Sequence, residues 1–570
     1  MSTNRRGFLE ALAQQEAEAH NANNEDRIFK KYANSALPTV LAKSTAGLNP
    51  YNGQWGEAEA THLIRRTMFG VKHSDVQALT GMSMSQAVDY LLNNIPGTPA
   101  APINDYNTNS YTDPTGVPSG QTWINAPYGD GNVNGKRRAS LKVWWLKQMV
   151  HQNLSINEKM VFFWHNHFGV RYADVNDARM CYTYHQLLRS NALGNFKTLV
   201  TEVTFNPAML KFLNGYLNTN TAPDENYARE IQELFTVSKE NNVNYTEADV
   251  QQAARIFTGW RINTSTLTSY FDPTKHDTGN KQFSAFYNNA VVAGQAGSNG
   301  ANEAHQFINM LFNKFETARY ICKKLYRYFV YYNIDSSIMS SVIDPLAQIL
   351  VANNFEIKPV LAALLKSQHF FDMDSRGCFI RTPLDLVVGT ARTFGLTMPN
   401  NFSLNEDFLG WNYLRNQAVN LGLDLGDPPN VAGWPCFYQT PQFYEIWLNS
   451  FTLGARMRFT DMMMNQGFTA GTSATIKIDI LAVAAQFAQA ENPDLLVDHF
   501  ASMMLGIEPG QIEHNSLKAI LLSNQSQNYY WSNAWNNYVS NPDVANTNIV
   551  KSRLASMLTA LTRLGEHQLS

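Results

Sequence analysis

The sequence predicts an all-α protein, a large multi-helix globular fold with two long surface loops and a short hairpin. Apolar residues recur at helical spacing along most of the chain, and capping residues stand where several of these segments begin or end. Alternating β-branched runs long enough for a central sheet are almost absent. Two stretches crowded with Pro, Gly, Asn, Asp and Ser, 97–135 and 263–302, are too long for ordinary connections and predict the loops. A Gly/Asn/Ala-rich part of the second loop predicts the hairpin.

The first predicted helix covers residues 58–69. Its apolar side chains share one face, Arg65 and Arg66 are expected on the other face, and Gly70 ends the helix. The same spacing predicts further helices at 139–152, 156–167, 178–190, 226–239, 247–259, 303–312, 315–331, 337–353, 358–367, 383–395, 476–489, 493–504, 512–522 and 548–565.

Three segments are expected along the chain. Residues 1–50 are polar and predict an N-terminal arm, residues 51–460 predict a helical core, and residues 461–570 predict a C-terminal helical subdomain or extension. No fixed-period repeat is visible, which disfavours a solenoid.

The composition indicates a packed fold without an overall basic field. The 570 residues carry a formal net charge of −3 and are 44% hydrophobic and 16% charged, so nucleic acid and anionic lipid are not predicted partners. The longest basic cluster, Lys136 to Arg138, is interpreted as a solvated helix start. No apolar run of about 18 residues occurs, and no membrane span is predicted.

Cysteine spacing and the N-terminal residues are the two features that relate to the cellular compartment of the protein. Four widely separated cysteines without a CxxC pair are predicted to be buried thiols, which leaves the redox compartment open. Arg5 and Arg6 with the following Gly-Phe-Leu resemble a twin-arginine export signature, but residues 11–24 are polar where an export signal has an apolar stretch. The protein is expected in the cytoplasm, or in the periplasm or extracellular space if this signal works.

A His-x-His pair stands at the end of the predicted helix 156–167. Helical residues two apart point about 200° from each other, so His165 and His167 can share a ligand only if the helix ends there, as Gly169 indicates. Neutral imidazole binds zinc, copper and iron. The pair is either part of a divalent metal site or one buried and one partly exposed histidine.

The segment 223–234 predicts a helix capped by Asp224. Glu225 and Arg229 form an i,i+4 pair, which is typical of a solvent-facing helix surface laced with ion pairs. The alternative is a buried site in which Glu225 ligates a metal ion and Glu230 exchanges protons, with Arg229 setting their pKa values.

A third polar group follows a helix whose capping box joins Thr246 to Asp249. In the loop beyond it, His276, Asp277 and Lys281 place a base, a carboxylate and a cation within six residues. They are candidates for catalysis, and a turn stabilised by Asp277 is the alternative.

The segment 426–435 is a rigid Pro- and Gly-rich turn that ends near an aromatic cluster. Such aromatic side chains stack on sugar rings or pack a core. No GxSxG elbow, P-loop, Rossmann fingerprint, HExxH motif or EF-hand loop occurs, so several common enzyme classes lose support.

The order of these motifs resembles the DUF1800 family. The motifs are LIRRTMFG, WHNHF, ENYARE, YTEADV with ARIFTGW, the HD-and-Lys loop and PPNVAGWP, spread over about two thirds of the chain. The resemblance implies a bacterial protein, often exported and often accompanied by a DUF1501-type partner, with no agreed biochemical function. Many relatives have Glu-Leu-His-Thr where this chain has Phe235 in place of the histidine, which weakens a metal site that uses that position.

Two functions are therefore expected. One is a metal-assisted hydrolase that acts on an extracellular polymer, and the other is a non-catalytic scaffold or partner-binding protein whose polar motifs form a structural network. The residues predicted for the hydrolase site are His165, His167 and Glu225 as metal ligands, with Glu230, Arg229, His276, Asp277 and Lys281 as catalytic or substrate-binding groups.

Overall fold

The structure, a computed structural model, describes residues 47–240, 245–471 and 475–570. Helices dominate these ranges, which confirms the predicted all-α class. The strands form three two-stranded antiparallel hairpins, whose bounds are Trp260–Asn263 with Thr268–Phe271 (β1–β2), Lys281–Gln282 with Val291–Val292 (β3–β4) and Phe468–Thr469 with Thr475–Ile476 (β5–β6). The β3–β4 hairpin is the short hairpin predicted in the second loop.

The helices of the first half are α3 (Glu57–Thr67), α4 (His73–Thr80), α5 (Met84–Asn93), α6 (Gly131–His151), α7 (Asn157–Phe168), α8 (Tyr172–Val175), α9 (Ala178–Ser190), α10 (Phe196–Thr204), α11 (Pro207–Phe212), α12 (Glu225–Glu230), the π-helix η2 (Ile231–Phe235) and α13 (Glu247–Ile256).

The later helices are α14 (Ala301–Phe312), α15 (Phe315–Phe329), α16 (Ser336–Ile338), the π-helix η6 (Met339–Ile343), α17 (Asp344–Ala352), α18 (Ile357–Leu365), α19 (Pro383–Thr393), α20 (Leu404–Asn420), α21 (Ser450–Asn465), α22 (Ile480–Ala484), α23 (Pro493–Met504), α24 (Gln511–Leu521), α25 (Tyr529–Ser540) and α26 (Val544–Thr562).

Short 3₁₀ turns join these elements. They are η1 (Gly215–Leu217), η3 (Pro273–Lys275), η4 (Ala285–Tyr287), η5 (Gly297–Gly300), η7 (Met373–Ser375), η8 (Pro435–Phe437), η9 (Phe443–Trp447) and η10 (Gly565–Gln568).

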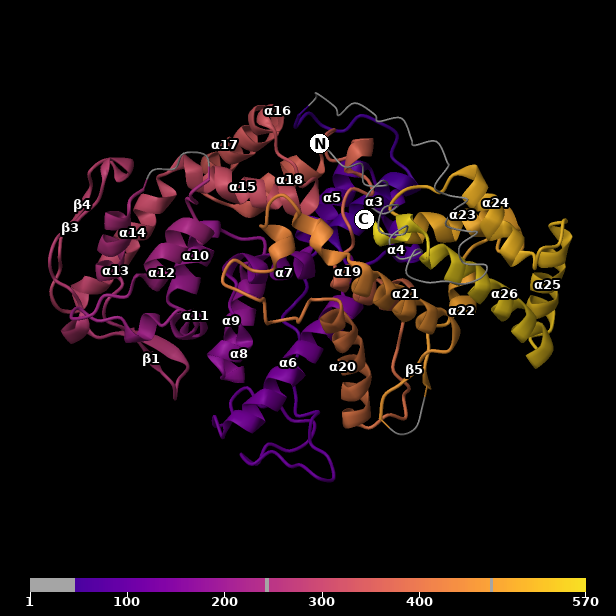
Figure 1. The fold of residues 1–570 in the computed structure, drawn as a ribbon, viewed down its shortest axis with the longest axis horizontal. Coiled ribbons are helices and arrows are strands. Elements are labelled where there is room, and N and C mark those ends of the chain that lie inside the picture. The colour runs from indigo at the N-terminus through magenta and orange to yellow at the C-terminus, as the bar shows by residue number, and fades with distance from the viewer. Residues whose placement is uncertain (1–46, 241–244, 472–474) are drawn as a thin grey trace.

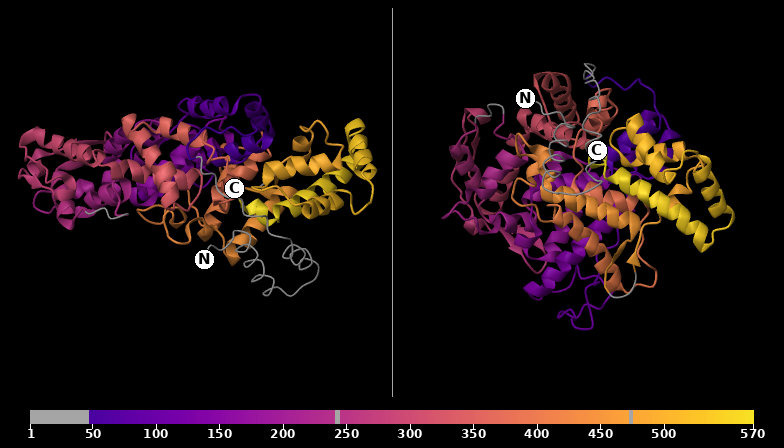
Figure 2. Two further views of the ribbon diagram at one scale, coloured as in Figure 1. Left: turned by 90° about the horizontal axis from the view of Figure 1, so that it is seen from above. Right: turned by 45° about the vertical axis from the view of Figure 1, so that its right-hand side comes forward.

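The molecule is elongated, and its two ends are built from different parts of the chain. Helices α10 to α14 and the β3–β4 hairpin form one end, and α23 to α26 form the other (Figures 1 and 2). Between them lie α3, α6, α7, α15 and α19, so the middle of the molecule joins segments that are far apart in the sequence (Figure 1).

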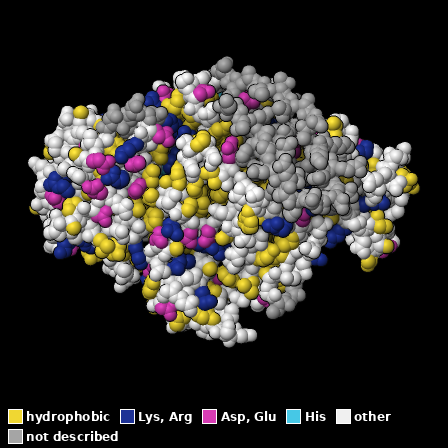
Figure 3. All heavy atoms as spheres, viewed as in Figure 1, with side chains coloured by type: hydrophobic (Ala, Val, Ile, Leu, Met, Phe, Trp, Pro, Cys, Tyr) yellow, Lys and Arg dark blue, Asp and Glu magenta, His cyan; other side chains and the backbone are white. Residues whose placement is uncertain are grey.

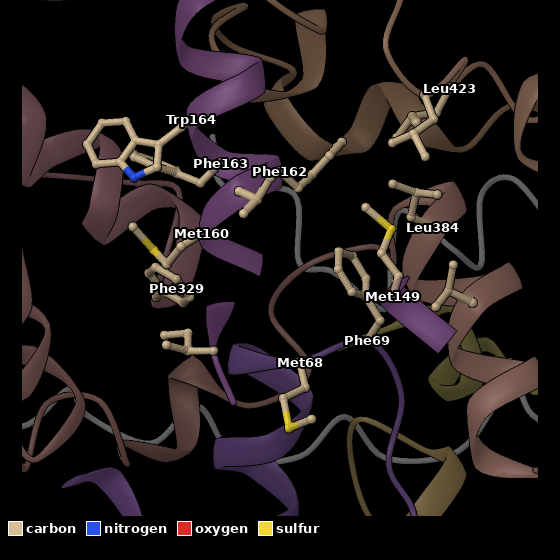
Figure 4. Close-up of a cluster of buried hydrophobic side chains, with 14 of the residues drawn as sticks. Met68, Phe69, Met149, Met160, Phe162, Phe163, Trp164, Phe329, Leu384 and Leu423 are labelled. Carbon is tan, nitrogen blue, oxygen red and sulfur yellow. The ribbon is translucent and has the colours of Figure 1, made fainter. Parts of the chain in front are cut away.

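Helix α7 runs through the core, and every one of its residues is buried. Phe162, Phe163 and Trp164 pack in different directions, and Met68, Phe69, Met149, Phe329 and Leu384 from other segments surround the helix (Figure 4). Because this helix has no solvent face, its polar residues must find partners inside the protein.

Most predicted helices occur, and 178–190 and 493–504 have the predicted bounds. The capping box of Thr246 with Asp249 is also present. The predicted helix 476–489 is wrong, because β6 occupies its start and only the five-residue α22 is helical. Helices α4, α5, α8, α10, α11, α20, α21 and α25 were not predicted.

Two interpretations of basic residues were wrong. Arg65 and Arg66 are buried rather than on a solvent face, and their guanidinium groups donate to backbone carbonyls of other segments. Arg137 is also fully buried, and it forms an ion pair with Asp113 at 2.9 Å. It lies inside α6, so the cluster at 136–138 is not a solvated helix start.

The cysteine prediction is confirmed, since Cys181, Cys322, Cys378 and Cys436 are buried and form no disulfide bond among the described residues. Within the described ranges, no helix is long and apolar enough to cross a membrane. Arg5, Arg6 and most of the predicted arm lie outside the described residues. The boundary at residue 460 stays a prediction.

Candidate functional site

An open pocket lies in the middle of the molecule, where α3, α7, α15, the start of α19 and the η8–η9 segment meet. It contains about 860 Å³ of empty space, counted to include the part open to solvent. Hydrophobic side chains gather near the middle of the face shown in Figure 3. Several aromatic side chains form the pocket walls, among them Phe162, Phe163, Tyr328, Phe437, Phe443 and Trp447.

Basic side chains outnumber acidic ones in this pocket. Those that line it are Arg65, Arg66, Lys159, Lys324 and Arg327, against the single acidic side chain of Asp385; Ser570 also lines the pocket, and its backbone oxygen accepts from Arg66. The excess of positive charge is the pocket's main electrostatic feature.

The arginines of α3 donate hydrogen bonds to backbone oxygens, and Nη1 of Arg66 also donates to the backbone oxygen of Ser570 at 3.3 Å. Arg65 donates to the carbonyl oxygens of Ser502 and Met503, at 3.2 and 3.3 Å. Nε of Arg66 donates to the carbonyl of Phe329 at 2.8 Å. Carbonyl oxygens orient a guanidinium group without cancelling its charge.

A second layer of cations stands beside the pocket. Arg456 is fully buried, and its guanidinium donates to the carbonyl of Arg381 at 2.7 Å. Loss of solvation lowers the pKa of Arg381 to about 10, and loss of solvation together with the Arg381 charge lowers that of Arg456 to about 9. Both side chains therefore remain charged at neutral pH in surroundings that disfavour a cation.

Asp385 balances only part of this charge. It forms an ion pair with Lys159 and accepts a hydrogen bond from Oγ1 of Thr382 at 2.9 Å, as the capping box of α19. The ammonium group of Lys159 also lies 4.2 Å from the ring centroid of Phe69. Lys159 is thus held by its own partners.

Arg327 has a polar atom without a partner. Its Nη1 lies 3.6 Å from Glu240, and the guanidinium lies 5.2 Å from the ring centroid of Phe443. Its Nε is buried and has no hydrogen-bond partner in the part of the chain that the structure describes. A buried donor of this kind is costly unless a bound group accepts from it.

His167 and Lys324 form a polar pair in the same pocket. Nε2 of His167 lies 3.2 Å from the carbonyl oxygen of Phe235, which can only accept, so Nε2 carries the proton. Nδ1 is left to accept, and Nζ of Lys324 lies 3.1 Å from it. Burial holds the pKa of His167 well below its usual range, and the Lys324 charge lowers it further.

Loss of solvation also lowers the pKa of Lys324 to about 7, with Glu240 opposing the shift and Arg327 adding to it. A large fraction of this side chain therefore carries a neutral amine at physiological pH.

His165 points away from this pair. It is fully buried among the rings of Trp145, Tyr172, Tyr184 and Trp434, with centroid distances of 5.2 to 6.1 Å. Neither ring nitrogen has a hydrogen-bond partner among the described residues, and burial lowers its pKa to about 3. Helix α7 does end at Gly169 as predicted, but the two histidines have no partner in common.

The ENYARE segment forms a charged surface strip. Glu225 and Arg229 are 40% and 33% exposed at their side chains and form the predicted ion pair at 3.0 Å, and Arg229 also pairs with Glu247. Burial raises the pKa of Glu230 to about 7, Glu233 adds to this shift and Arg229 opposes it. Glu230 forms no side-chain hydrogen bond or ion pair with any described residue.

The HD loop builds a buried network instead of an open site. Nζ of Lys281 lies 2.5 Å from Oε2 of Glu303, and Nε2 of His276 lies 3.1 Å from its other oxygen. All three side chains are fully enclosed. Asp277 binds Arg255 through two contacts at 2.8 and 3.0 Å, and it also accepts the N–H of Gly279. A ligand could reach Lys281 only after this network opened.

These positions bear on the predicted metal centre. Across residues 47–240, 245–471 and 475–570, no three His, Cys, Asp or Glu side chains are grouped so that they could hold a metal ion, and His165, His167 and Glu225 do not form such a group. Of the eight predicted site residues, only His167 lines the basic pocket.

The pocket cations were missed from the sequence. Arg65 and Arg66 were placed on the face of the helix opposite its apolar side chains, and no role was predicted for Lys159, Lys324 and Arg327, which lie in predicted helices. The available signal was weak: each basic residue interrupts a strongly apolar helix.

The fold and pocket define a class, an all-α protein whose central helices enclose a basic pocket with aromatic walls. The chain belongs to the DUF1800 family, described as a protein of unknown function, whose family model matches residues 62–562. No curated protein and no solved structure matches the chain.

Proposed function

We propose that this protein binds an anionic organic molecule in the basic pocket. The observation that carries the proposal is the imbalance of charge: five basic side chains and one acidic side chain line one cavity. Burying cations away from water costs several kcal/mol each unless they are compensated, and a bound carboxylate, sulfate or phosphate would compensate them.

The walls of the pocket support a ligand with an apolar part. Ligand sites are typically lined by apolar and aromatic side chains with a few polar groups, and this pocket has such a lining. Phe437 and Trp447 offer flat apolar surfaces, while the unpartnered Nε of Arg327 offers a donor. Such walls suit a compact organic acid better than an inorganic ion alone.

The test is a binding measurement on the full chain. Titration calorimetry with citrate, benzoate and sulfate, at constant ionic strength, should detect saturable binding of at least one anion. Arg327→Gln should weaken it by roughly ten- to a hundredfold, because one charge-assisted hydrogen bond contributes about 1.5–3 kcal/mol.

Arg319→Gln is the matched control. Arg319 is on the same helix, binds Asp344 at 2.7 Å and lies 5.0 Å from the ring centroid of Phe315, but it does not line the pocket. Its replacement should leave anion binding unchanged. The proposal fails if no anion binds, or if the two variants lose affinity equally.

A metal-assisted hydrolase acting on an extracellular polymer, expected from the sequence, receives less support. Its proposed ligands His165 and His167 contact different partners, and its third proposed ligand, Glu225, is paired with Arg229 at the surface. Metal analysis of the purified protein with His165→Ala and His167→Ala tests that function separately.

The scaffold function has one specific observation in its favour. The enclosed contacts of Lys281 and His276 with Glu303 hold the second loop against α14. This supports a structural role for the HD loop, and such a role is compatible with a ligand pocket elsewhere in the molecule.

A further inference from the structure

We propose that Lys324 is a nucleophilic amine that forms an imine with a small anionic aldehyde or keto compound held in the basic pocket. This inference rests on the proposed function, because the anion must first bind. It adds a covalent role for one lysine and narrows the ligand to an oxo acid.

Lys324 differs from the other cations of the pocket in its partners. Lys159 is paired with Asp385, and Arg327 lies near Glu240. For Lys324, no carboxylate among the described residues lies within ion-pair distance. In the described part of the chain, its ammonium group contacts Nδ1 of His167 at 3.1 Å and the ring of Tyr320, whose centroid lies 5.1 Å away.

This environment favours a neutral amine. A half-buried ammonium group without a counter-ion loses solvation and gains little in return, so the uncharged form is stabilised. A neutral amine has the free electron pair that attack on a carbonyl carbon requires. Neighbouring cations add to the effect, because a second positive charge in the same pocket repels the ammonium form.

His167 orients the amine. Its Nε2–H donates to the carbonyl of Phe235, so Nδ1 accepts one N–H of Lys324. This hydrogen bond fixes the directions of the other N–H bond and of the lone pair on Nζ. Helix α7 is buried along its whole length, which keeps the imidazole in place. We assign His167 as a positioning residue that can also take up a proton.

The reaction balances without a further reagent. Nζ of Lys324 adds to the carbonyl carbon, a C–N bond forms, and the carbonyl π electrons move to oxygen. One N–H proton passes to Nδ1 of His167 and on to the alkoxide oxygen, which gives the carbinolamine, and the second N–H proton then follows the same route to the hydroxyl oxygen. Loss of that oxygen as water breaks the C–O bond and gives the imine. No atom is oxidised or reduced.

Anion recognition selects the class of carbonyl compound. The guanidinium groups that line the pocket suit a carboxylate, and the free Nε of Arg327 can donate to one of its oxygens. A carboxylate next to or near the carbonyl group would be held while the amine reacts. Short oxo acids such as pyruvate and glyoxylate carry both groups.

The experiment traps the imine. The full-length protein is incubated with pyruvate or glyoxylate and sodium cyanoborohydride, digested, and analysed by peptide mass spectrometry. The expected result is a reduced adduct on Lys324 that forms faster than adducts on other lysines. Acetaldehyde, which lacks the anion, should modify Lys324 at least tenfold more slowly than glyoxylate relative to surface lysines.

Lys323 is the matched control, since it neighbours Lys324 on α15 but pairs with Glu240 at 3.2 Å and does not line the pocket. Lys324→Met should abolish the rapid adduct, whereas Lys323→Met should preserve it. A thermal melt of each variant shows that loss of the adduct is not loss of the fold. An adduct spread over surface lysines and unchanged in Lys324→Met would overturn the inference.

Two variants of His167 test its positioning role separately. His167→Gln keeps an acceptor oxygen for Lys324 and should retain much of the trapping rate, whereas His167→Leu should lower it and shift its pH profile. Equal rates in both variants would overturn the positioning role.

Failure of the covalent inference and failure of the proposed function give different results. If calorimetry shows anion binding but glyoxylate gives no selective adduct at Lys324, the covalent inference is wrong and the proposed function stands. If no anion binds, both are wrong.

Discussion

The side-chain oxygen of Asn166 accepts the backbone N–H of Trp434 at 2.9 Å, across 268 residues of sequence. This hydrogen bond joins the WHNHF segment to the PPNVAGWP turn. Two glycines permit the close approach: a Cβ at Gly433 would lie 2.4 Å from the same oxygen, and one at Gly169 would lie 2.1 Å from the carbonyl oxygen of Val431. The contact fixes the end of α7, and with it the position of His167 in the pocket.

The Gly169→Ala variant should lose roughly 2–4 kcal/mol of unfolding free energy, because the added methyl group collides with backbone and the residue has a φ of +61°. Gly395→Ala is the control: its φ is +59°, and nothing lies within 4 Å of the added Cβ. It should lose only about 1 kcal/mol. Urea denaturation of both variants measures the difference, and equal losses would contradict the importance of the Val431 contact.

Local signals made most of the fold predictable. Helical spacing located α9 and α23 with their observed bounds, and Thr246 with Asp249 marked the start of α13. These features depend on residues close in sequence. The prediction that a helix starts at residue 476 was wrong because Thr475–Ile476 pairs with the strand Phe468–Thr469, and helical periodicity does not reveal such pairing.

The candidate site was less predictable because it depends on contacts between distant segments. Arg66 looked like a surface residue of an amphipathic helix, yet its carbonyl partner Phe329 lies 263 residues away. The three motifs rich in His, Glu and Asp were predicted to form one site, but most of their residues form separate structural contacts. His167 was selected correctly as a polar group of interest, but its partner Lys324 is 157 residues away and carries no local signal.

The pair of Lys281 and Glu303 should be a strong stabilising contact only while both partners are present. Both side chains are fully enclosed, so Glu303→Gln should cost about 3 kcal/mol by leaving the buried ammonium group with only the more distant carboxylate of Asp277, 3.9 Å away. Lys239→Met, which breaks the exposed contact with Glu233 at 3.3 Å, should cost less than about 1 kcal/mol. Urea denaturation compares them, and similar losses would argue against a buried network in the HD loop.

Glu230 should make the folded state less stable as pH rises toward neutrality. Its pKa in the folded protein is about 7, above the ordinary value of 4.5, so the folded state holds the proton more tightly than the unfolded state. The stability from this group is present below pH 4.5 and is lost as pH rises through 7. The effect should be at most about 1 kcal/mol, since solvent screens a partly exposed group.

Denaturant midpoints between pH 4.5 and pH 8 provide the measurement for this window. Glu230→Gln cannot ionise, so its stability should fall less than that of the natural chain over the same range. Two parallel curves would show that Glu230 titrates normally and would also weaken the idea that it serves as a general base near neutral pH.

His165 should make the stability of the folded state depend on pH with the opposite sign to Glu230. Burial lowers its pKa to about 3 from the ordinary 6.5, so the unfolded chain binds a proton that the folded chain refuses. The stability from this group is complete above pH 6.5 and is lost as pH falls toward 3.

The imidazole signal of His165, assigned by NMR with His165→Phe, should therefore stay constant from about pH 8 to pH 5. His165→Phe fills the same aromatic enclosure without ring nitrogens and should be less sensitive to acid. A signal that titrates near pH 6.5 would show that water or another partner reaches the ring, and the enclosed aromatic site would then be wrong.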